Sequence, residues 1–116
     1  MTIKRFHMGP RMSQVVVHRG TIYVAGQVAD DPQPSVREQT RQFLAKIDRL
    51  LAEVSSDRSK ILSANVWLAD MGRFAEMNEV WDAWVAPGAT PTRATVEAKL
   101  ARPANLVEIV VVASVG

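Results

Sequence analysis

Leu106-Val107-Glu108-Ile109-Val110-Val111-Val112-Ala113, near the end of the chain, is apolar at every position but one. Its β-branched residues favour a β-strand. A strand with one buried face alternates between apolar and polar residues, whereas a strand buried on both faces is apolar throughout. Helices can cover one face of a sheet, and 116 residues supply nothing obvious for the other. We therefore expect an oligomer in which another subunit covers the bare face of the sheet.

Four earlier stretches also have the composition of strands. Residues 14–18 and 21–26 are β-rich and flank Arg19-Gly20, which predicts a hairpin with a short turn. Residues 61–69 place alternate apolar side chains on one face, by the two-residue period of a strand. A further strand is predicted over residues 92–100.

Two amphipathic helices are predicted between these strands. Ser35-Val36-Arg37-Glu38 fits a capping box, in which the Ser hydroxyl bonds the third amide of the helix and the Glu reaches back to the cap. This helix ends near residues 55–57, and its apolar residues recur at helical spacing: Val36, Phe43, Leu44, Ile47, Leu50, Leu51 and Val54. Asp70 is the expected cap of the second helix, which residues 87–91 stop. The apolar stripe of the second helix consists of Phe74, Met77, Trp81, Trp84 and Val85.

The predicted elements follow one another in the order ββαβαββ. Because amphipathic helices need a sheet face to cover, we expect an α+β fold with one mixed sheet and two helices on one of its faces. The length suits a single domain over residues 1–116. A chain of this size buries roughly two-thirds of the surface that it exposes when unfolded, which is enough for a core.

Composition and charge exclude several classes of protein. Cysteine is absent, which excludes a disulfide scaffold, a cysteine-based zinc site and a thiol nucleophile. No apolar stretch is long enough to span a membrane, and the first residues lack the apolar region of a signal peptide, so we expect a cytoplasmic protein without a membrane partner. The net charge is only +2, and basic and acidic residues alternate over residues 37–53, so no nucleic-acid partner is expected. His7 and His18 are isolated, which argues against a metal site.

Glu108 and Arg93 are the residues best suited to chemistry. An unpaired buried carboxylate is costly, so Glu108 either reaches solvent or a structural cation such as Lys99 or Arg102, or faces a wet pocket as a general base. Arg93 is either a surface residue where a loop meets a strand or a bidentate clamp for a carboxylate.

Two other positions are weaker candidates for ligand contact. Gly26 marks either a bulge or a close backbone approach to a ligand. Asn78 can offer its amide to a ligand or to the backbone, and Trp81 and Trp84 are expected to pack in the core.

The order of motifs resembles the Rid (YjgF/YER057c/UK114) family of reactive-intermediate deaminases over nearly the whole chain. The matching motifs are Gly20-Thr21-Ile22-Tyr23-Val24-Ala25-Gly26-Gln27-Val28, the first helix with Gln39, Thr40 and Leu44, Val66-Trp67-Leu68-Ala69-Asp70, Phe74-Ala75-Glu76-Met77-Asn78, Pro91-Thr92-Arg93-Ala94-Thr95-Val96 and Val107-Glu108-Ile109. The most diagnostic feature is the separation of Arg93 and Glu108, which lie fifteen positions apart as in active members of the family. Residues 81–85 look most like a bacterial subgroup.

This resemblance implies a chorismate-mutase-like fold and a homotrimer with ligand pockets between subunits. It also implies a hydrolase that deaminates 2-imino acids such as 2-iminopropanoate, the tautomer of 2-aminoacrylate, to 2-keto acids and ammonia without a metal or organic cofactor. By position, Arg93 would clamp the substrate carboxylate, Glu108 would position the attacking water, and Gly26 and Asn78 would line the pocket.

Three pocket positions depart from the pattern of the family. Ala25 stands where many active members have Ser, Met12 where many have Tyr, and Thr95 where Cys is frequent. The alternative function is a trimer that binds small carboxylates without turnover or acts as a chaperone-like sensor. RNA cleavage has been associated with the family, but no segment here resembles a nuclease site.

Overall fold

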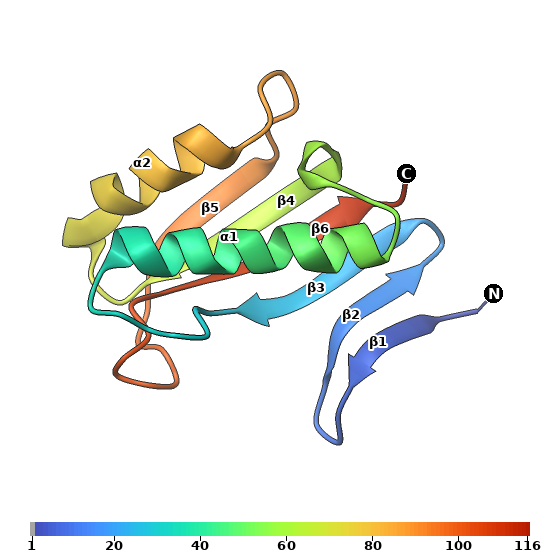
Figure 1. Cartoon of the computed structure of the whole chain (residues 1–116), viewed down its shortest axis with the longest axis horizontal. Coiled ribbons are helices and arrows are strands. Elements are labelled where there is room, and N and C mark those ends of the chain that lie inside the picture. Colours follow the sequence, from blue (N-terminus) through green and yellow to red (C-terminus); the bar gives the residue numbers. More distant parts are fainter. Residues whose placement is uncertain (1) are drawn as a thin grey trace.

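The computed structural model describes residues 2–116 as one sheet with two helices on one of its faces (Figure 1). The elements are β1 (Lys4–Met8), β2 (Ser13–His18), β3 (Thr21–Gln27), α1 (Val36–Glu53), η1 (Arg58–Lys60), β4 (Ile61–Leu68), η2 (Met71–Arg73), α2 (Phe74–Trp84), β5 (Thr92–Glu97) and β6 (Val107–Ser114). The expected α+β class with a mixed sheet is confirmed. The expected element order is incomplete, because β1 precedes the predicted hairpin.

The sheet has the strand order β1-β2-β3-β6-β4-β5. All neighbours are antiparallel except β4 and β5, which are parallel. A parallel pair needs a crossover connection, and α2 supplies it. The last strand of the chain, β6, therefore lies in the middle of the sheet between β3 and β4.

The core lies between the helices and one face of the sheet. Alternate residues of β6, namely Val107, Ile109 and Val111, are completely buried there. They belong to the same cluster as the buried stripe of α1, which contains Phe43, Leu44, Ile47 and Leu51. Burying these large side chains is the main favourable contribution to folding, at about 1.5–3 kcal/mol for each side chain.

The other set of β6 residues faces away from the helices and is only half-buried. Val110 and Val112 belong to it, and Val112 is paired with Tyr23, which is 50% exposed. We call this side of the sheet the open face. The both-sided apolar pattern of the strand is thus explained on one side by the helices, while the open face has no cover within residues 2–116.

The predicted helix caps are confirmed in part. Ser35 Oγ accepts a hydrogen bond of 3.1 Å from the Glu38 amide, as the capping box requires. The Glu38 carboxylate, however, pairs with Arg41 at 2.6 Å instead of reaching back to the cap. Asp70 caps the short turn η2, where Oδ1 accepts from the Gly72 amide, and α2 begins directly after that turn.

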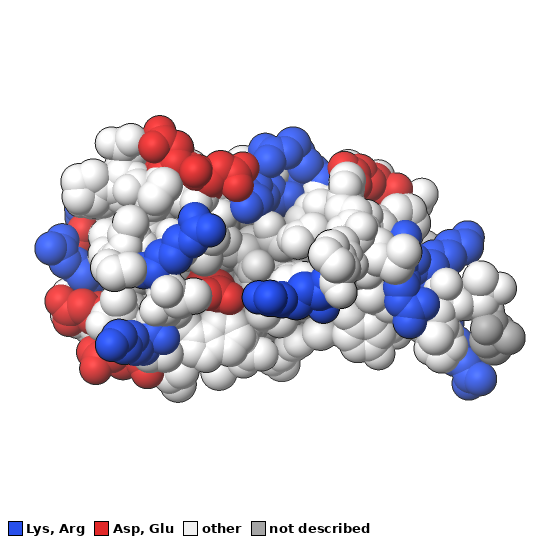
Figure 2. Space-filling model, turned by 90° about the horizontal axis from the view of Figure 1, so that it is seen from below, with Lys and Arg blue, Asp and Glu red and all other residues white. Residues whose placement is uncertain are grey.

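The predicted strand over residues 92–100 is too long. The last backbone bond that continues its pairing joins the Ala98 amide to the Leu68 carbonyl, and residues 98–106 form a loop beyond it. Within residues 2–116, neither helix is long and apolar enough to cross a bilayer. The face seen in Figure 2 carries Lys and Arg in separated groups with acidic residues among them, and no continuous basic stripe runs over it.

Candidate functional site

Glu108 lies half-buried on the open face, where it is paired with Trp67 of β4. The register of β3 against β6 shifts between Val24 and Gln27, so β3 bulges beside this carboxylate. A Cβ added to Gly26, which lies in the bulge, would overlap Glu108 Oε2. Gly26 therefore lies in a bulge, as one of its two sequence interpretations predicted, and its missing side chain leaves room for the Glu108 carboxylate.

A cavity of about 580 Å³ opens beside Glu108. Its wall includes the predicted residues Met12 and Gly26 together with Gln14, Asp30 and Arg102. In the part of the chain that is described, Glu108 has no ion-pair partner, although Lys99 and Arg102 were the expected structural cations. The carboxylate is thus available to a ligand. Sequence reasoning missed Gln14 and Asp30, because nothing in the chain order indicates that they approach β6.

Arg93 lies on the opposite side of the sheet. Arg93 is paired with Ala64 of β4, which is buried under the helices. Ala64 lies three residues before Trp67, the partner of Glu108, and residues an odd number of positions apart in a strand point to opposite faces. Arg93 therefore faces the helices. Its Cζ lies 5.2 Å from the ring centroid of Trp81 and 5.8 Å from that of Phe74, and Nη1 lies 4.0 Å from the Met77 sulfur.

The Arg93 guanidinium has no oxygen acceptor among residues 2–116. Burial lowers the pKa of Arg93 from its usual value, and the charge of Asp82 opposes this shift. An arginine remains protonated in proteins, so the group is a partly desolvated cation whose N–H donors are free to bind an anion.

Two more predicted residues carry unpaired oxygens on this helix-facing side. Thr95 follows Arg93 by two positions on the same face of β5, and Asn78 lies on α2 next to Met77. Thr95 Oγ1 and Asn78 Oδ1 are buried, and within residues 2–116 neither has a hydrogen-bond partner. Leaving such an atom unpaired costs about 1–3 kcal/mol. Both atoms are therefore free to bond to a ligand or to a water molecule.

The predicted site residues thus fall into two groups that do not share a cavity within one chain. Glu108, Gly26 and Met12 surround the cavity on the open face, whereas Arg93, Asn78 and Thr95 lie on the helix-facing side of the sheet. Ala25 is in the bulge of β3, where its carbonyl accepts a hydrogen bond from the buried Gln27 side chain.

The sequence predicted that Trp81 is buried, but not that its ring contacts Arg93. Trp81 was expected to pack in the core, and it is buried there, but its ring also contacts the guanidinium. The signal was present in the sequence, because Phe74, Met77 and Trp81 recur at helical spacing around Asn78 and so share one face of α2.

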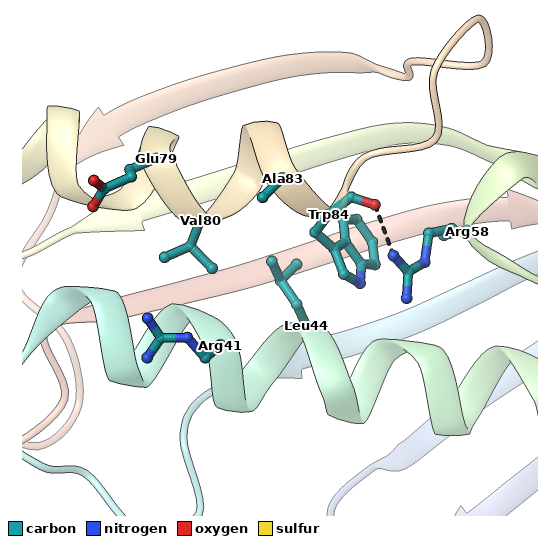
Figure 3. Close-up of a pocket in the computed structure, with 7 residues that line it drawn as sticks. All are labelled: Arg41, Leu44, Arg58, Glu79, Val80, Ala83 and Trp84. Carbon is teal, nitrogen blue, oxygen red and sulfur yellow. Dashed lines mark hydrogen bonds between the residues drawn. The ribbon is translucent and has the colours of Figure 1, made fainter.

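A separate groove of about 400 Å³ lies between the two helices (Figure 3). Leu44, Val80 and Ala83 make it apolar, and Arg41 and Arg58 lie at its sides. Both cations already have partners, because Arg41 pairs with Glu38 and Arg58 pairs with Asp48 at 2.7 Å and donates to the Trp84 carbonyl. The groove is therefore a poorer anion site than the surroundings of Arg93. Within residues 2–116, no cluster of three or more His, Cys, Asp or Glu side chains could hold a metal ion.

Comparison with known proteins places the chain in one family. The family model described as Endoribonuclease L-PSP matches residues 2–115. A RutC family protein of Haemophilus ducreyi is 45% identical, with 97% of each chain covered, and the RutC family protein YoaB of Escherichia coli is 45% identical over 99% of this chain and 100% of its own.

The solved structures give the same result. NMB1025 from Neisseria meningitidis, a member of the YjgF protein family, superposes with a TM-score of 0.97 at 49% identity, covering 100% of this chain and 97% of its own. By sequence and by fold, the chain belongs to the YjgF/RutC family of Endoribonuclease L-PSP proteins, which is the Rid family that its motifs resemble.

Proposed function

We propose that this protein hydrolyses 2-imino acids to 2-keto acids and ammonia, and that each site combines Arg93 of one subunit with Glu108 of another. The observation that carries the proposal is that neither of these two charged groups has a partner of opposite charge within residues 2–116 of a single chain. Arg93 is a partly desolvated cation without an acceptor, and Glu108 is a carboxylate without a cation, among the residues described. The Rid family has enamine and imine deaminase activity in general, which agrees with this pair.

The chemistry follows from what each group can do. Arg93 holds the substrate carboxylate through two parallel N–H donors. Glu108 accepts a proton from a water whose oxygen bonds to the imine carbon, and returns this proton to the imine nitrogen to give a carbinolamine. The hydroxyl proton of the carbinolamine then moves to the nitrogen as the carbon–nitrogen bond breaks, so that ammonia leaves, a carbonyl forms and Glu108 is again a carboxylate. General-base assistance of this kind typically contributes about 10²–10⁴-fold. Thr95 Oγ1 and Asn78 Oδ1 are the free polar atoms beside the clamp.

Association of subunits would bring the two groups together. Arg93 and Glu108 face opposite sides of the sheet, so a single chain cannot present both to one small substrate. The open face carries exposed apolar side chains, with Tyr23 and Val96 both about half exposed, and large apolar patches on a protein surface mark protein–protein contact. We propose a homotrimer, as the family resemblance implies.

The test is to generate 2-iminopropanoate in solution with an amino-acid oxidase and to follow its decay with and without the protein. We expect the protein to accelerate decay, and Arg93→Ala and Glu108→Gln to return the rate to background. Arg41→Ala is the matched control, because it removes an exposed arginine that pairs only with Glu38. An Arg93→Ala variant as fast as the wild type would overturn the proposal. A wild type that binds 2-keto acids but turns over no imine would favour the non-catalytic alternative.

A further inference from the structure

Helix α2 carries two tryptophans, and each of them has an arginine over its ring. Arg93 Cζ lies 5.2 Å from the centroid of Trp81, and Arg58 Cζ lies 4.9 Å from that of Trp84. The two rings are themselves in contact, with centroids 5.6 Å apart. The contacts resemble each other in geometry, but the two arginines differ in what else surrounds them.

Arg58 is paired with a carboxylate and a carbonyl group. Its Nε and Nη2 donate to the two Asp48 oxygens, and its Nη1 donates to the Trp84 carbonyl at 2.8 Å. The Trp84 ring nitrogen also donates to Asp48, so this cluster is closed and neutral. Because Asp48 neutralises its charge and three of its five N–H donors are in use, Arg58 is a poorer anion site than Arg93, and its contacts join η1 to the two helices.

The contacts of Arg93 hold the cation while leaving most of its donors free. Phe74 contributes a second ring at 5.8 Å, and the one hydrogen bond of the guanidinium within residues 2–116 runs from Nη1 to the Met77 sulfur at 4.0 Å. Attraction to aromatic rings compensates a cation for part of its lost hydration. A carboxylate in their place would neutralise the guanidinium and compete with an anionic ligand, whereas rings leave its N–H groups free.

We propose that Trp81 and Phe74 are positioning residues, which hold the Arg93 guanidinium in one place so that it binds the substrate carboxylate with little loss of side-chain freedom. This inference rests on the proposed function, because it concerns the same clamp. Neither ring needs to touch the reacting atoms. An arginine side chain has many rotamers in solution, and fixing it before the ligand arrives removes an entropic cost of binding.

The experiment measures the binding of 2-oxobutanoate, a stable 2-keto acid, by titration calorimetry. Trp81→Leu should raise its Kd about tenfold, and Phe74→Leu several-fold, because both remove a ring from the cation. Trp81→Phe keeps an aromatic face and should stay within about threefold of the wild type. Trp84→Leu is the matched control, since it removes the same residue type from the same helix without touching Arg93, and it should leave the Kd unchanged.

Steady-state kinetics give a second readout that a purely structural role would not move. Loss of carboxylate binding that is equal in the ground state and the transition state raises KM and leaves kcat unchanged. We expect this split for Trp81→Leu and Phe74→Leu. Misfolding would instead lower the amount of active protein and so reduce the apparent kcat. Phe74 is only partly buried, so Phe74→Leu decides the question if Trp81→Leu does not fold.

The outcomes separate this inference from the proposed function. If folded Trp81→Leu and Phe74→Leu bind 2-oxobutanoate like the wild type while Arg93→Ala does not bind it, the positioning role is overturned and the clamp stands. An equal loss of affinity in Trp84→Leu would also overturn the positioning role. If Arg93→Ala binds as well as the wild type, or if the wild type does not bind, the clamp and the inference both fail.

Discussion

Gly26 shows how a single missing side chain shapes the site. Among its nearest neighbours outside its own chain segment, all the atoms that an added Cβ would meet belong to Glu108. Its backbone is not in the left-handed region, since only Gly20, Gly88 and Gly116 among the glycines have positive φ. The requirement at Gly26 is therefore space for a carboxylate and not conformational freedom.

Gly26→Ala should therefore damage activity more than stability. The overlapping atoms are the end of a flexible side chain, so Glu108 can swing away while the fold is kept. Because the carboxylate then no longer meets the attacking water, we expect kcat for imine hydrolysis to fall by about 10²-fold. The measurement is kcat together with a thermal melt.

Gly20→Ala is the contrasting control for this prediction. Gly20 has a φ of +77° in the turn between β2 and β3, and nothing lies within 4 Å of an added Cβ. Strain at this φ should lower the melting temperature without changing kcat. A Gly26→Ala variant with the wild-type rate would show that Glu108 does not need its present position.

At the scale of elements, short polar caps fix how the chain passes from helix to sheet. After α1, the turn η1 begins at Asp57, whose carboxylate accepts hydrogen bonds from the Ser59 amide at 2.8 Å and from the Ser59 hydroxyl. Lys60 adds an ion pair at 3.0 Å. Directly after this turn, β4 enters the sheet between β6 and β5, so the cap helps to set where that strand starts.

The cap predicts a pH-dependent contribution to stability. Hydrogen bonds from the Ser59 side chain and from Lys60 lower the pKa of Asp57 from 3.8 to about 2. Because the folded value is the lower one, the contribution is complete above about pH 4 and is lost as the pH falls toward 2. Asp57→Asn should thus be less stable than the wild type at pH 7, and the difference should shrink as the pH falls through about 2. Denaturant unfolding across this range checks it, and a constant difference from pH 7 to 2 would contradict it.

At the scale of the whole molecule, the sheet is covered on one side only. The helices bury Val107, Ile109 and Val111, whereas Val110 and Val112 of the same strand stay partly exposed on the open face. Exposed apolar surface is costly in water and is removed by association. Assembly and activity are thus expected to depend on the same face, because Glu108 lies on it too.

Val112→Glu should break the assembly without unfolding the chain. Val112 is partly exposed in a single subunit, so a charge there can reach water until another subunit covers it. Light scattering should give the mass of a trimer for the wild type and a lower mass for the variant, with imine hydrolysis lost in parallel. Ala45→Glu places the same charge on the exposed side of α1 and should change neither. A wild type that is monomeric at micromolar concentration would contradict the interface.

The sequence by itself determined the helices, five of the six strands and the residue types of the site. These features depend on local periodicity and on side-chain chemistry, which are properties of neighbours along the chain. The sequence did not predict β1, because Lys4-Arg5-Phe6-His7-Met8 is an exposed edge strand whose side chains show no apolar alternation. The family, too, could be recognised from motifs in their order.

Only the tertiary structure decided that Arg93 and Glu108 face opposite sides of one sheet. That outcome depends on the register of β4 with β5 on one side and with β6 on the other, and such register joins residues far apart in the sequence. A shift of one residue in either pairing would exchange the faces. The same long-range pairing placed Gly26 beside Glu108 and left Arg93 between two aromatic rings. The type of each side chain thus fixes what chemistry it can do, whereas the register of the strands decides which side chains come together.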